Sequence, residues 1–154
     1  MTSDEALARE AIRKTAARYT RAVDNRRYDE LRDVFLPEGS IAVQGGGRLE
    51  GVEAIITAFG AGAEKRQAAA PGNFQRHNLT SSMIEITGPN TARAVHYVMV
   101  VTELGFDHSG MYQDIFHRRG DAWLIFERTA SMEWVRPESR FAAWLGAAAP
   151  VASF

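Results

Sequence analysis

Two residues far apart along the chain, an aspartate and a histidine, are of the types that acid–base catalysis uses most. Asp24 stands where a helical pattern ends, and His77 stands where a loop enters a predicted strand. The residues alone leave a plainer explanation open for each of them. Asp24 also fits a solvated or capping aspartate at a helix end, and His77 fits a hydrogen-bonded histidine at a strand edge.

Tyr19 and Arg128 are two further polar side chains that the sequence pattern directs toward the interior. Tyr19 lies on the apolar stripe of the first predicted helix. Core packing alone would explain its ring, and its hydroxyl could donate a hydrogen bond to any nearby carbonyl. Arg128 faces inward if its strand alternates and Leu124 and Phe126 face inward too. A buried arginine needs an anionic partner. Alternatively, Arg128 lies on the outer face or pairs with an acid for structural reasons.

Motifs for other chemistries are missing from the sequence. It holds no Walker loop, no HExxH and no GxSxG. Gly45-Gly46-Gly47 lacks the βαβ context of a dinucleotide fingerprint and predicts a hairpin turn. There are no cysteines, which excludes disulfides, thiolate nucleophiles and cysteine-ligated metals. No tight metal-ligand spacing relates the four histidines, His77, His96, His108 and His117. A metal site could still be assembled in space, but nothing in the sequence asks for one. We expect chemistry that needs no metal, nucleotide or flavin cofactor.

Composition is that of one ordinary globular domain. The chain has 154 residues, of which 45% are hydrophobic and 24% charged, with a formal net charge of -1. This balance suggests neither nucleic acid nor an anionic membrane as a partner. The first five residues are polar and acidic, and no apolar run approaches the ~20 residues of a membrane span. We expect a cytoplasmic protein without a signal peptide.

The first half of the chain reads as helices around one short hairpin. Thr2 and Glu5 form a capping-box pattern ahead of an apolar stripe at steps of three or four residues. Pro37-Glu38-Gly39 is expected to stop the second helix, and an Ala/Gly-rich loop is expected to follow the third. The predicted elements are helices over 3–23, 28–35 and 51–59, hairpin strands over 40–44 and 48–50, and a loop over 60–72.

The second half reads as four consecutive β-strands. Gly88-Pro89-Asn90, a four-residue stretch over 104–107, and Gly120-Asp121 separate them and are turn signals at hairpin spacing. Helices followed by a meander predict an α+β fold, with the helices on one face of an antiparallel sheet. The predicted strands are 77–87, 92–103, 108–119 and 122–133.

The run from Ala94 to Val101 is apolar on both faces. A strand with one wet face should alternate, so the second face must be covered by another element or another subunit. The predicted helices can cover only one face. We therefore expect a homo-oligomer, either a dimer or a trimer.

The C-terminal segment differs in character from the rest of the chain. We divide the sequence into a domain over 1–134 and a tail over 135–154, in which Phe141, Trp144 and Leu145 suggest a short amphipathic helix. The tail is a lid over a pocket, an interface arm, or a frayed end. The sequence leaves all three open.

Several local patterns follow one another along the chain: Tyr19-Thr20-Arg21-Ala22-Val23-Asp24, Leu36-Pro37-Glu38-Gly39, Leu49-Glu50-Gly51-Val52-Glu53-Ala54-Ile55, Arg76-His77-Asn78-Leu79-Thr80, Gly110-Met111-Tyr112-Gln113-Asp114 and Gly120-Asp121-Ala122-Trp123 leading to Arg128. In this order and spacing, they resemble the SnoaL-like branch of the nuclear-transport-factor-2-like (NTF2-like) superfamily. This branch includes scytalone dehydratase, bile acid dehydratase and the lindane dehydrochlorinase. The resemblance covers the chain to about Trp134 and implies a cone: a curved antiparallel sheet and N-terminal helices around a pocket, also described as a cystatin-like α+β barrel.

The resemblance implies roles for four residues. In the lyase members, an aspartate at the position of Asp24 and a histidine at that of His77 form the catalytic pair. The position of Tyr19 holds a catalytic tyrosine or lysine in those enzymes, and that of Arg128 a pocket-lining arginine. The second active-site histidine of scytalone dehydratase has no secure match here; His96 is the nearest candidate and is not assigned. This departure argues against scytalone itself as the substrate.

The implied function is a cofactor-independent lyase of the dehydratase type, acting on a small hydrophobic cyclic or polyketide-like substrate. A free imidazole has a pKa of about 6.5, which suits a general base, and a carboxylate on its other nitrogen fixes the tautomer. An isomerase or cyclase with the same pair, or a ligand-binding domain without catalysis, remains open because the fold does not settle function. The aromatic residues expected around the substrate are Phe35, Phe59, Tyr97, Tyr112 and Trp134.

Overall fold

The protein consists of one curved sheet with helices packed against it. A computed structural model describes residues 2–69 and 74–153. The sheet has six strands in the order β2-β1-β6-β5-β4-β3. The elements are α1 (Ser3–Asp24), a 3-10 helix (Tyr28–Asp33), β1 (Phe35–Val43), β2 (Gly47–Glu50), α2 (Val52–Ala69), β3 (Gln75–Gly88), β4 (Thr91–Thr102), β5 (Gly105–Arg119), β6 (Ala122–Val135) and α3 (Ala142–Leu145).

Helix α1 forms because its start is capped and one stripe of it is apolar. The Thr2 hydroxyl accepts the backbone N–H of Glu5 at 3.2 Å, and the Glu5 carboxylate accepts that of Thr2 at 2.9 Å. The stripe of Ile12, Ala16 and Tyr19 is buried against the sheet. The capping box and the stripe predicted this helix to within one residue of its observed end.

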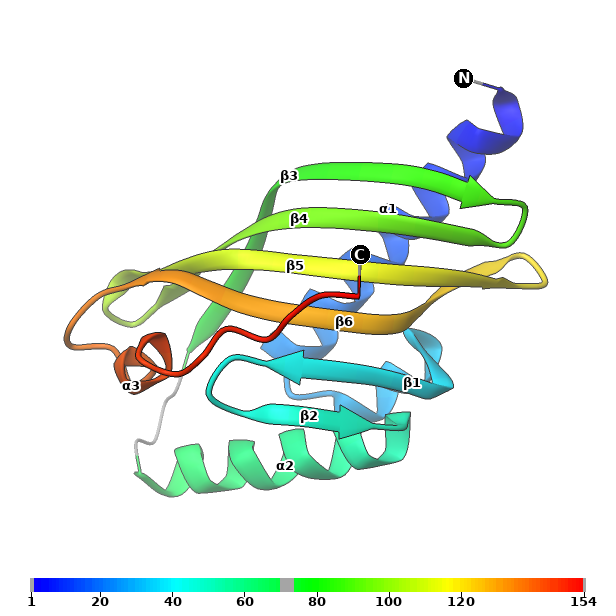
Figure 1. Cartoon of the computed structure of the whole chain (residues 1–154). Helices are drawn as coiled ribbons and strands as arrows, with labels where there is room; N and C mark the ends of the chain where they lie inside the picture. Colours follow the sequence, from blue (N-terminus) through cyan, green and yellow to red (C-terminus); the bar gives the residue numbers. More distant parts are fainter. Residues whose placement is uncertain (1, 70–73, 154) are drawn as a thin grey trace.

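The four long strands β3 to β6 form an antiparallel meander, and β1 then pairs with β6 in parallel. Helix α1 lies across one face of the curved sheet, and α2 runs beside the hairpin of β1 and β2 (Figure 1). The sheet does not close, since β2 and β3 remain its two edges. The predicted α+β fold with helices on one face of a curved sheet is confirmed.

Two boundary predictions were wrong. The helix over 28–35 ends at Asp33, and Pro37-Glu38-Gly39 lies inside β1, where the β1–β6 register shifts between Phe35 and Ser40. This irregularity removes the need for a ladder N–H at Pro37. A Cβ atom on Gly39 would lie 2.9 Å from the Ile125 carbonyl oxygen, so glycine permits the close approach of the two strands.

The predicted loop after the third helix is helical for most of its length. Helix α2 continues to Ala69, because the high helix propensity of the alanines in this stretch offsets the low propensity of Gly60 and Gly62. The predicted loop residues 70–72 lie outside the described residues. In the described parts of the chain, no helix combines the length and apolarity needed to cross a membrane.

Candidate functional site

Asp24 and His77 meet where the end of α1 approaches the start of β3. The His77 ring Nδ1 lies 2.6 Å from Asp24 Oδ1, and the His77 backbone N–H donates to Asp24 Oδ2 at 3.0 Å. Their side chains are 6% and 12% exposed for Asp24 and His77, respectively. A carboxylate only accepts hydrogen bonds, so Nδ1 carries a proton, and in the neutral imidazole Nε2 is then the nitrogen with the lone pair. Within the described residues, Nε2 has no hydrogen-bond partner.

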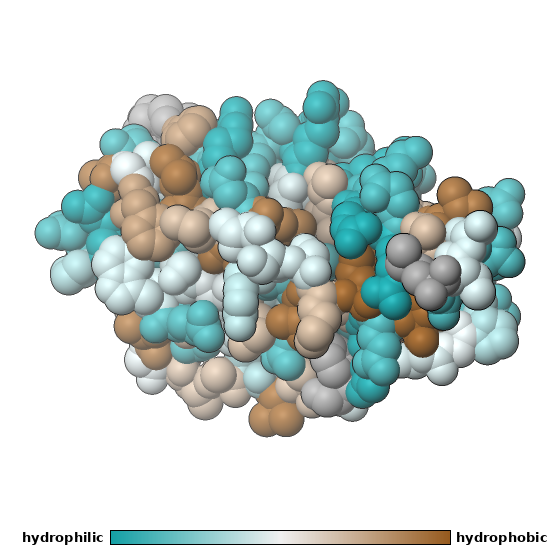
Figure 2. Space-filling view, turned by 90° about the horizontal axis from the view of Figure 1, so that it is seen from above, coloured by the Kyte–Doolittle hydropathy of each residue, from teal (hydrophilic) through white to brown (hydrophobic). Residues whose placement is uncertain are grey.

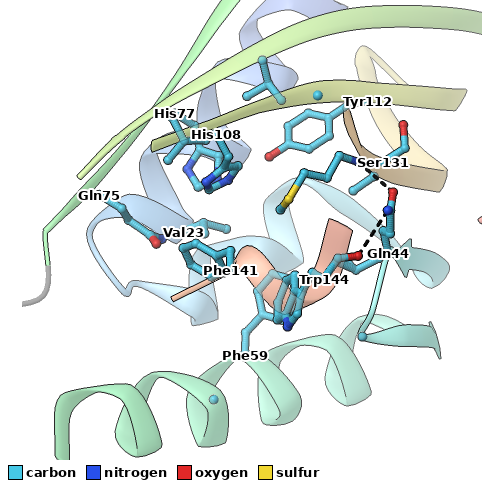
Figure 3. A pocket seen from close by; sticks show the side chains of 18 of the residues that line it. Val23, Gln44, Phe59, Gln75, His77, His108, Tyr112, Ser131, Phe141 and Trp144 are labelled. Carbon is cyan, nitrogen blue, oxygen red and sulfur yellow. Dashed lines mark hydrogen bonds between the residues drawn. The ribbon is translucent and has the colours of Figure 1, made fainter. Parts of the chain in front are cut away.

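A cavity of about 320 Å³ opens beside this pair. Figure 3 shows His77, Tyr112, Phe59 and Trp144 around it, contributed by different elements of the fold. Its walls are mainly apolar and aromatic, and the described lining residues include no lysine, arginine, aspartate or glutamate. A cavity of this size and character suits a small, uncharged organic molecule.

Tyr19 and Tyr112 line the cavity, and both rings pack against the Arg128 guanidinium. The guanidinium carbon lies 4.1 Å from the centre of the Tyr19 ring and 4.3 Å from that of Tyr112. Arg128 also donates two hydrogen bonds, of 2.7 and 2.6 Å, to the carboxylate of Asp114. Burial raises the pKa of Tyr19 to about 12 although Arg128 opposes the shift, so the phenol stays protonated and able to donate.

The SnoaL-like domain model matches residues 4–129, which is most of the chain. The chain belongs to the SnoaL-like family. No curated protein sequence matches it. Solved structures with the same fold include Rv3472 of Mycobacterium tuberculosis, a protein of unknown function solved as a single-substitution variant, with 19% identity over 93% of this chain and 87% of that chain, and a TM-score of 0.76.

Two other structures resemble this SnoaL-like protein over nearly their whole length. The hexachlorocyclohexane dehydrochlorinase LinA-type3 of Novosphingobium barchaimii LL02 is 18% identical over 89% of this chain and 94% of that chain, with a TM-score of 0.74. A protein of Novosphingobium aromaticivorans DSM 12444, provisionally named scytalone dehydratase, is 14% identical over 98% and 97%, with a TM-score of 0.77. At these identities the likeness shows the fold alone.

Three residues expected in the cavity wall of the SnoaL-like domain lie elsewhere, whereas Phe59 and Tyr112 do line the cavity. Phe35 is fully buried and packs edge-on behind Tyr19, at 6.0 Å between ring centres. Tyr97 and Trp134 are 53% and 44% exposed, and Trp134 stacks on Phe106. Tyr97 points outward because β4 turns Val98 and Val100 toward the cavity.

Trp134 points outward because of an irregularity in β6. Gly110 pairs with Met132, while its neighbour Ser109 pairs with Trp134, so β6 carries one extra residue at that point. The extra residue reverses the inward alternation, and a Cβ atom on Gly110 would collide with the Ser131 carbonyl oxygen at 2.0 Å. Without the irregularity, Trp134 would face the cavity as expected.

Arg128 and His96 lie in the layer beneath the cavity rather than in its wall. Arg128 is completely buried and does not line the cavity. Burial lowers the pKa of Arg128, but the Asp114 carboxylate raises it by more. His96 hydrogen-bonds Ser82 through Nδ1 at 2.7 Å, and burial is the main cause that lowers its pKa to about 4. His96 is therefore a neutral, buried side chain away from the cavity.

The C-terminal segment supplies two cavity residues that sequence reasoning did not assign, Phe141 and Trp144. Gln44 holds this segment: its amide N–H groups donate to the carbonyl oxygens of Trp144, Leu145 and Ala147 at 3.2, 3.3 and 3.2 Å. Its Oε1 accepts the backbone N–H of Met132 at 2.9 Å. The apolar spacing of Phe141 and Trp144 was the available signal for this contact.

Replacing Gln44 with leucine should loosen the tail. The substitution leaves the Met132 N–H and the tail carbonyls without their partner, so we expect a loss of about 1–3 kcal/mol in the free energy of unfolding. Trypsin should also cut faster at Arg136 or Arg140. Urea denaturation and timed proteolysis measure the two effects, with Gln113→Leu on the outer face as the control. Unchanged proteolysis would contradict the anchoring role of Gln44.

Proposed function

We propose that this protein is a cofactor-independent acid–base enzyme, most specifically a dehydratase-type lyase. The observation that carries the proposal is the Asp24–His77 pair beside an apolar cavity, with the unprotonated Nε2 of His77 free to act as a base. The LinA-type3 structure, which shares the fold, is named as a dehydrochlorinase, and dehydrochlorination is also an elimination.

In the proposed reaction, His77 Nε2 removes a C–H proton that is α or γ to a carbonyl group. Asp24 stabilises the imidazolium as it forms, because its carboxylate accepts the Nδ1 proton at 2.6 Å. The protonated phenol of Tyr19 donates to the enolate oxygen that develops on the substrate. Arg128 supports Tyr19 from behind the ring, so we assign it a positioning role in place of direct contact with the substrate.

The cavity favours a neutral hydrophobic substrate. Val23, Phe59, Val98 and Met132 contribute much of its surface, and none of its described lining side chains carries a permanent charge. An anionic substrate would lose its hydration there without gaining a cationic partner. A small cyclic or polyketide-like ketone with a β-hydroxyl group meets these requirements.

A panel of β-hydroxy ketones tests the proposed function. The panel comprises phenyl, naphthyl and cyclohexyl β-hydroxy ketones, and the rate of enone formation is followed by ultraviolet absorbance and mass spectrometry. Loss of water faster than in buffer supports a dehydratase. Deuterium uptake at a second carbon without loss of water would identify an isomerase instead. Binding of these ketones without either reaction, or no effect of the protein at all, would contradict an acid–base enzyme.

We also propose that a second copy of the chain covers the outer face of the sheet. Met83, Tyr97 and Met99 are 72%, 53% and 41% exposed there, on neighbouring strands. Seen from above the view of Figure 1, apolar residues form separate patches among hydrophilic ones (Figure 2). Tyr97 and Met99 stand two residues apart on β4, and Met83 pairs with Val95 of the same strand. The three side chains therefore point to one face and form a candidate contact surface.

Light scattering tests the assembly. We expect the wild-type mass to be a multiple of 17.0 kDa and the Tyr97→Glu/Met99→Lys variant to be a monomer. Leu7→Lys, at an exposed site on α1, serves as the control and should keep the wild-type mass. A wild-type monomer at micromolar concentration would contradict the proposal.

A further inference from the structure

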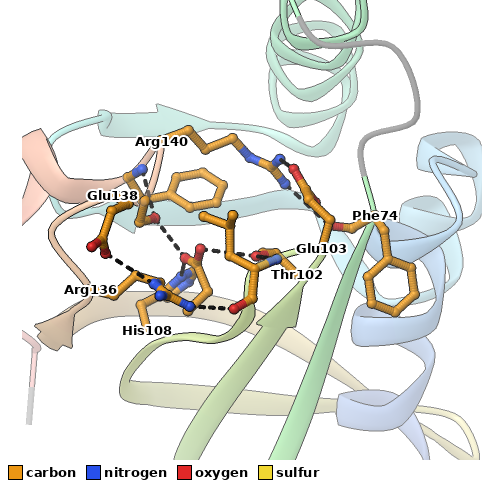
Figure 4. A network of polar contacts seen from close by, with 11 residues as sticks. Phe74, Thr102, Glu103, His108, Arg136, Glu138 and Arg140 are labelled. Carbon is orange, nitrogen blue, oxygen red and sulfur yellow. Dashed lines mark hydrogen bonds and ion pairs between the residues drawn. The ribbon is translucent and has the colours of Figure 1, made fainter.

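A second histidine–carboxylate pair lies at the start of β5. Asp107 is 1% exposed, and its Oδ2 lies 2.7 Å from His108 Nδ1. The same carboxylate accepts the hydroxyl of Thr102 at 3.0 Å and that of Ser139, in the C-terminal segment, at 2.7 Å (Figure 4). Three donors thus hold the carboxylate, and the carboxylate holds the imidazole ring.

His108 faces the same cavity as His77. Both residues pair with Val100 of β4, His77 from β3 and His108 from β5, so they lie in one row across three strands. Two strand spacings separate their backbones by about 10 Å. The side chains turn to the same face, and Figure 3 shows both rings on one side of the cavity. A small substrate can therefore meet both imidazoles at once.

The bonding of His108 repeats that of His77. Because the Asp107 carboxylate only accepts, Nδ1 carries the proton and Nε2 is the atom left for a substrate. Among the described residues, Nε2 of His108 has no hydrogen-bond partner. The edge of the Phe141 ring, at 4.9 Å between ring centres, holds the imidazole from the side of the tail.

The surroundings lower the pKa of His108, so its imidazolium is a stronger acid than a free one. Burial is the largest cause that lowers the pKa of His108, and Asp107 opposes this. Arg140 in the tail lowers it further, as does His77 on β3 once it has taken up a proton. Burial alone would raise the pKa of Asp107, but the hydrogen bonds from His108, Ser139 and Thr102 outweigh it and keep the carboxylate ionised. Asp107 therefore still stabilises a protonated His108 when one forms.

We propose that Asp107–His108 is a second acid–base pair, in which His108 protonates the leaving oxygen while His77 removes the C–H proton. This proposal rests on the proposed elimination. The C–H electron pair forms the carbon–carbon double bond, the C–O bond breaks, and the His108 proton leaves with the oxygen as water. The proton taken by His77 then returns to His108, directly or through solvent. His108 is a catalytic residue in this scheme, and Asp107 is a positioning residue.

Leaving-group dependence tests the role of His108. The β-hydroxy and β-acetoxy precursors of benzylideneacetone give the same enone, but only hydroxide needs a proton to leave. We expect His108→Gln to slow the hydroxy substrate about 100-fold or more and the acetoxy substrate less than about fivefold. His77→Gln should slow both substrates strongly. His117→Gln, outside the cavity, should slow neither.

Each other outcome has a definite meaning. Equal losses of rate on the two substrates in His108→Gln, or no loss, would overturn the acid role. Wild-type protein that leaves the hydroxy substrate at the buffer rate would overturn both proposals. If His77→Gln retains the acetoxy rate while His108→Gln still discriminates between the substrates, the role of His77 fails and that of His108 stands.

A measurement on the unsubstituted protein covers the case in which His108→Gln does not fold. A β-hydroxy ketone that carries two methyl groups on the carbon between its carbonyl and hydroxyl carbons cannot eliminate water, because that carbon has no proton to lose. On its addition we expect the ring-nitrogen NMR signals of His77 and His108 to shift and those of His117 to stay. A His108 signal that does not respond while His77 does would overturn the proposal.

Discussion

His77→Gln should lower the rate of enone formation by about 10²- to 10⁴-fold, the usual contribution of a general base. Glutamine can still hydrogen-bond Asp24 but cannot take up a proton at the position of Nε2. Asp24→Asn should lower the rate comparably, because an amide N–H in place of the carboxylate favours the opposite tautomer and places the proton on Nε2. Steady-state kinetics on the most reactive β-hydroxy ketone measures both effects.

The fold should survive these two substitutions. Asp24 and His77 join the ends of α1 and β3, but neither side chain belongs to the cluster of buried hydrophobic residues that forms the core. Circular dichroism and thermal unfolding of both variants check this point, with His117→Gln as the matched exchange outside the cavity. A folded His77→Gln protein with the wild-type rate would contradict the proposed function, and a variant that unfolds would assign the pair to stability.

Arg128→Met should destabilise the protein by about 3–5 kcal/mol, because it leaves the Asp114 carboxylate buried without its partner. Both side chains are 0% exposed, and the two hydrogen bonds between them are short. Asp114→Leu should destabilise the protein by a similar amount, because it leaves the Arg128 guanidinium buried without its partner. The double variant, which removes both charges, should recover most of the loss. Urea denaturation of the four proteins in a double-mutant cycle gives the coupling energy.

An exposed ion pair provides the comparison. Arg32 bonds Glu53 at 2.7 Å on the surface, and Arg32→Met should change stability little because solvent screens that pair. If Arg128→Met were instead as stable as the wild type yet inactive, the arginine would serve catalysis alone. A rate that stays low in the double variant after its stability has recovered would show that Arg128 acts by positioning Tyr19 and Tyr112.

The order of helices and strands could be read from the sequence because local patterns decide it. A capped apolar stripe specifies α1, and turn residues at hairpin spacing specify the meander of β3 to β6. These elements also carry Asp24 and His77 to their ends, although the residues alone left a plainer structural explanation open for each of them. Their resemblance to a family linked them before any distance was known.

Only the tertiary structure decided which side chains share the cavity. One extra residue in β6 turns Trp134 away, and a strand that is apolar on both faces hides the outward direction of Tyr97. The pairing of Arg128 with Asp114 depends on the register of two strands, and that of Asp107 with Ser139 joins residues 32 positions apart. Local periodicity fixes the shape of an element, whereas contacts between elements depend on register and chain packing, which no single segment contains.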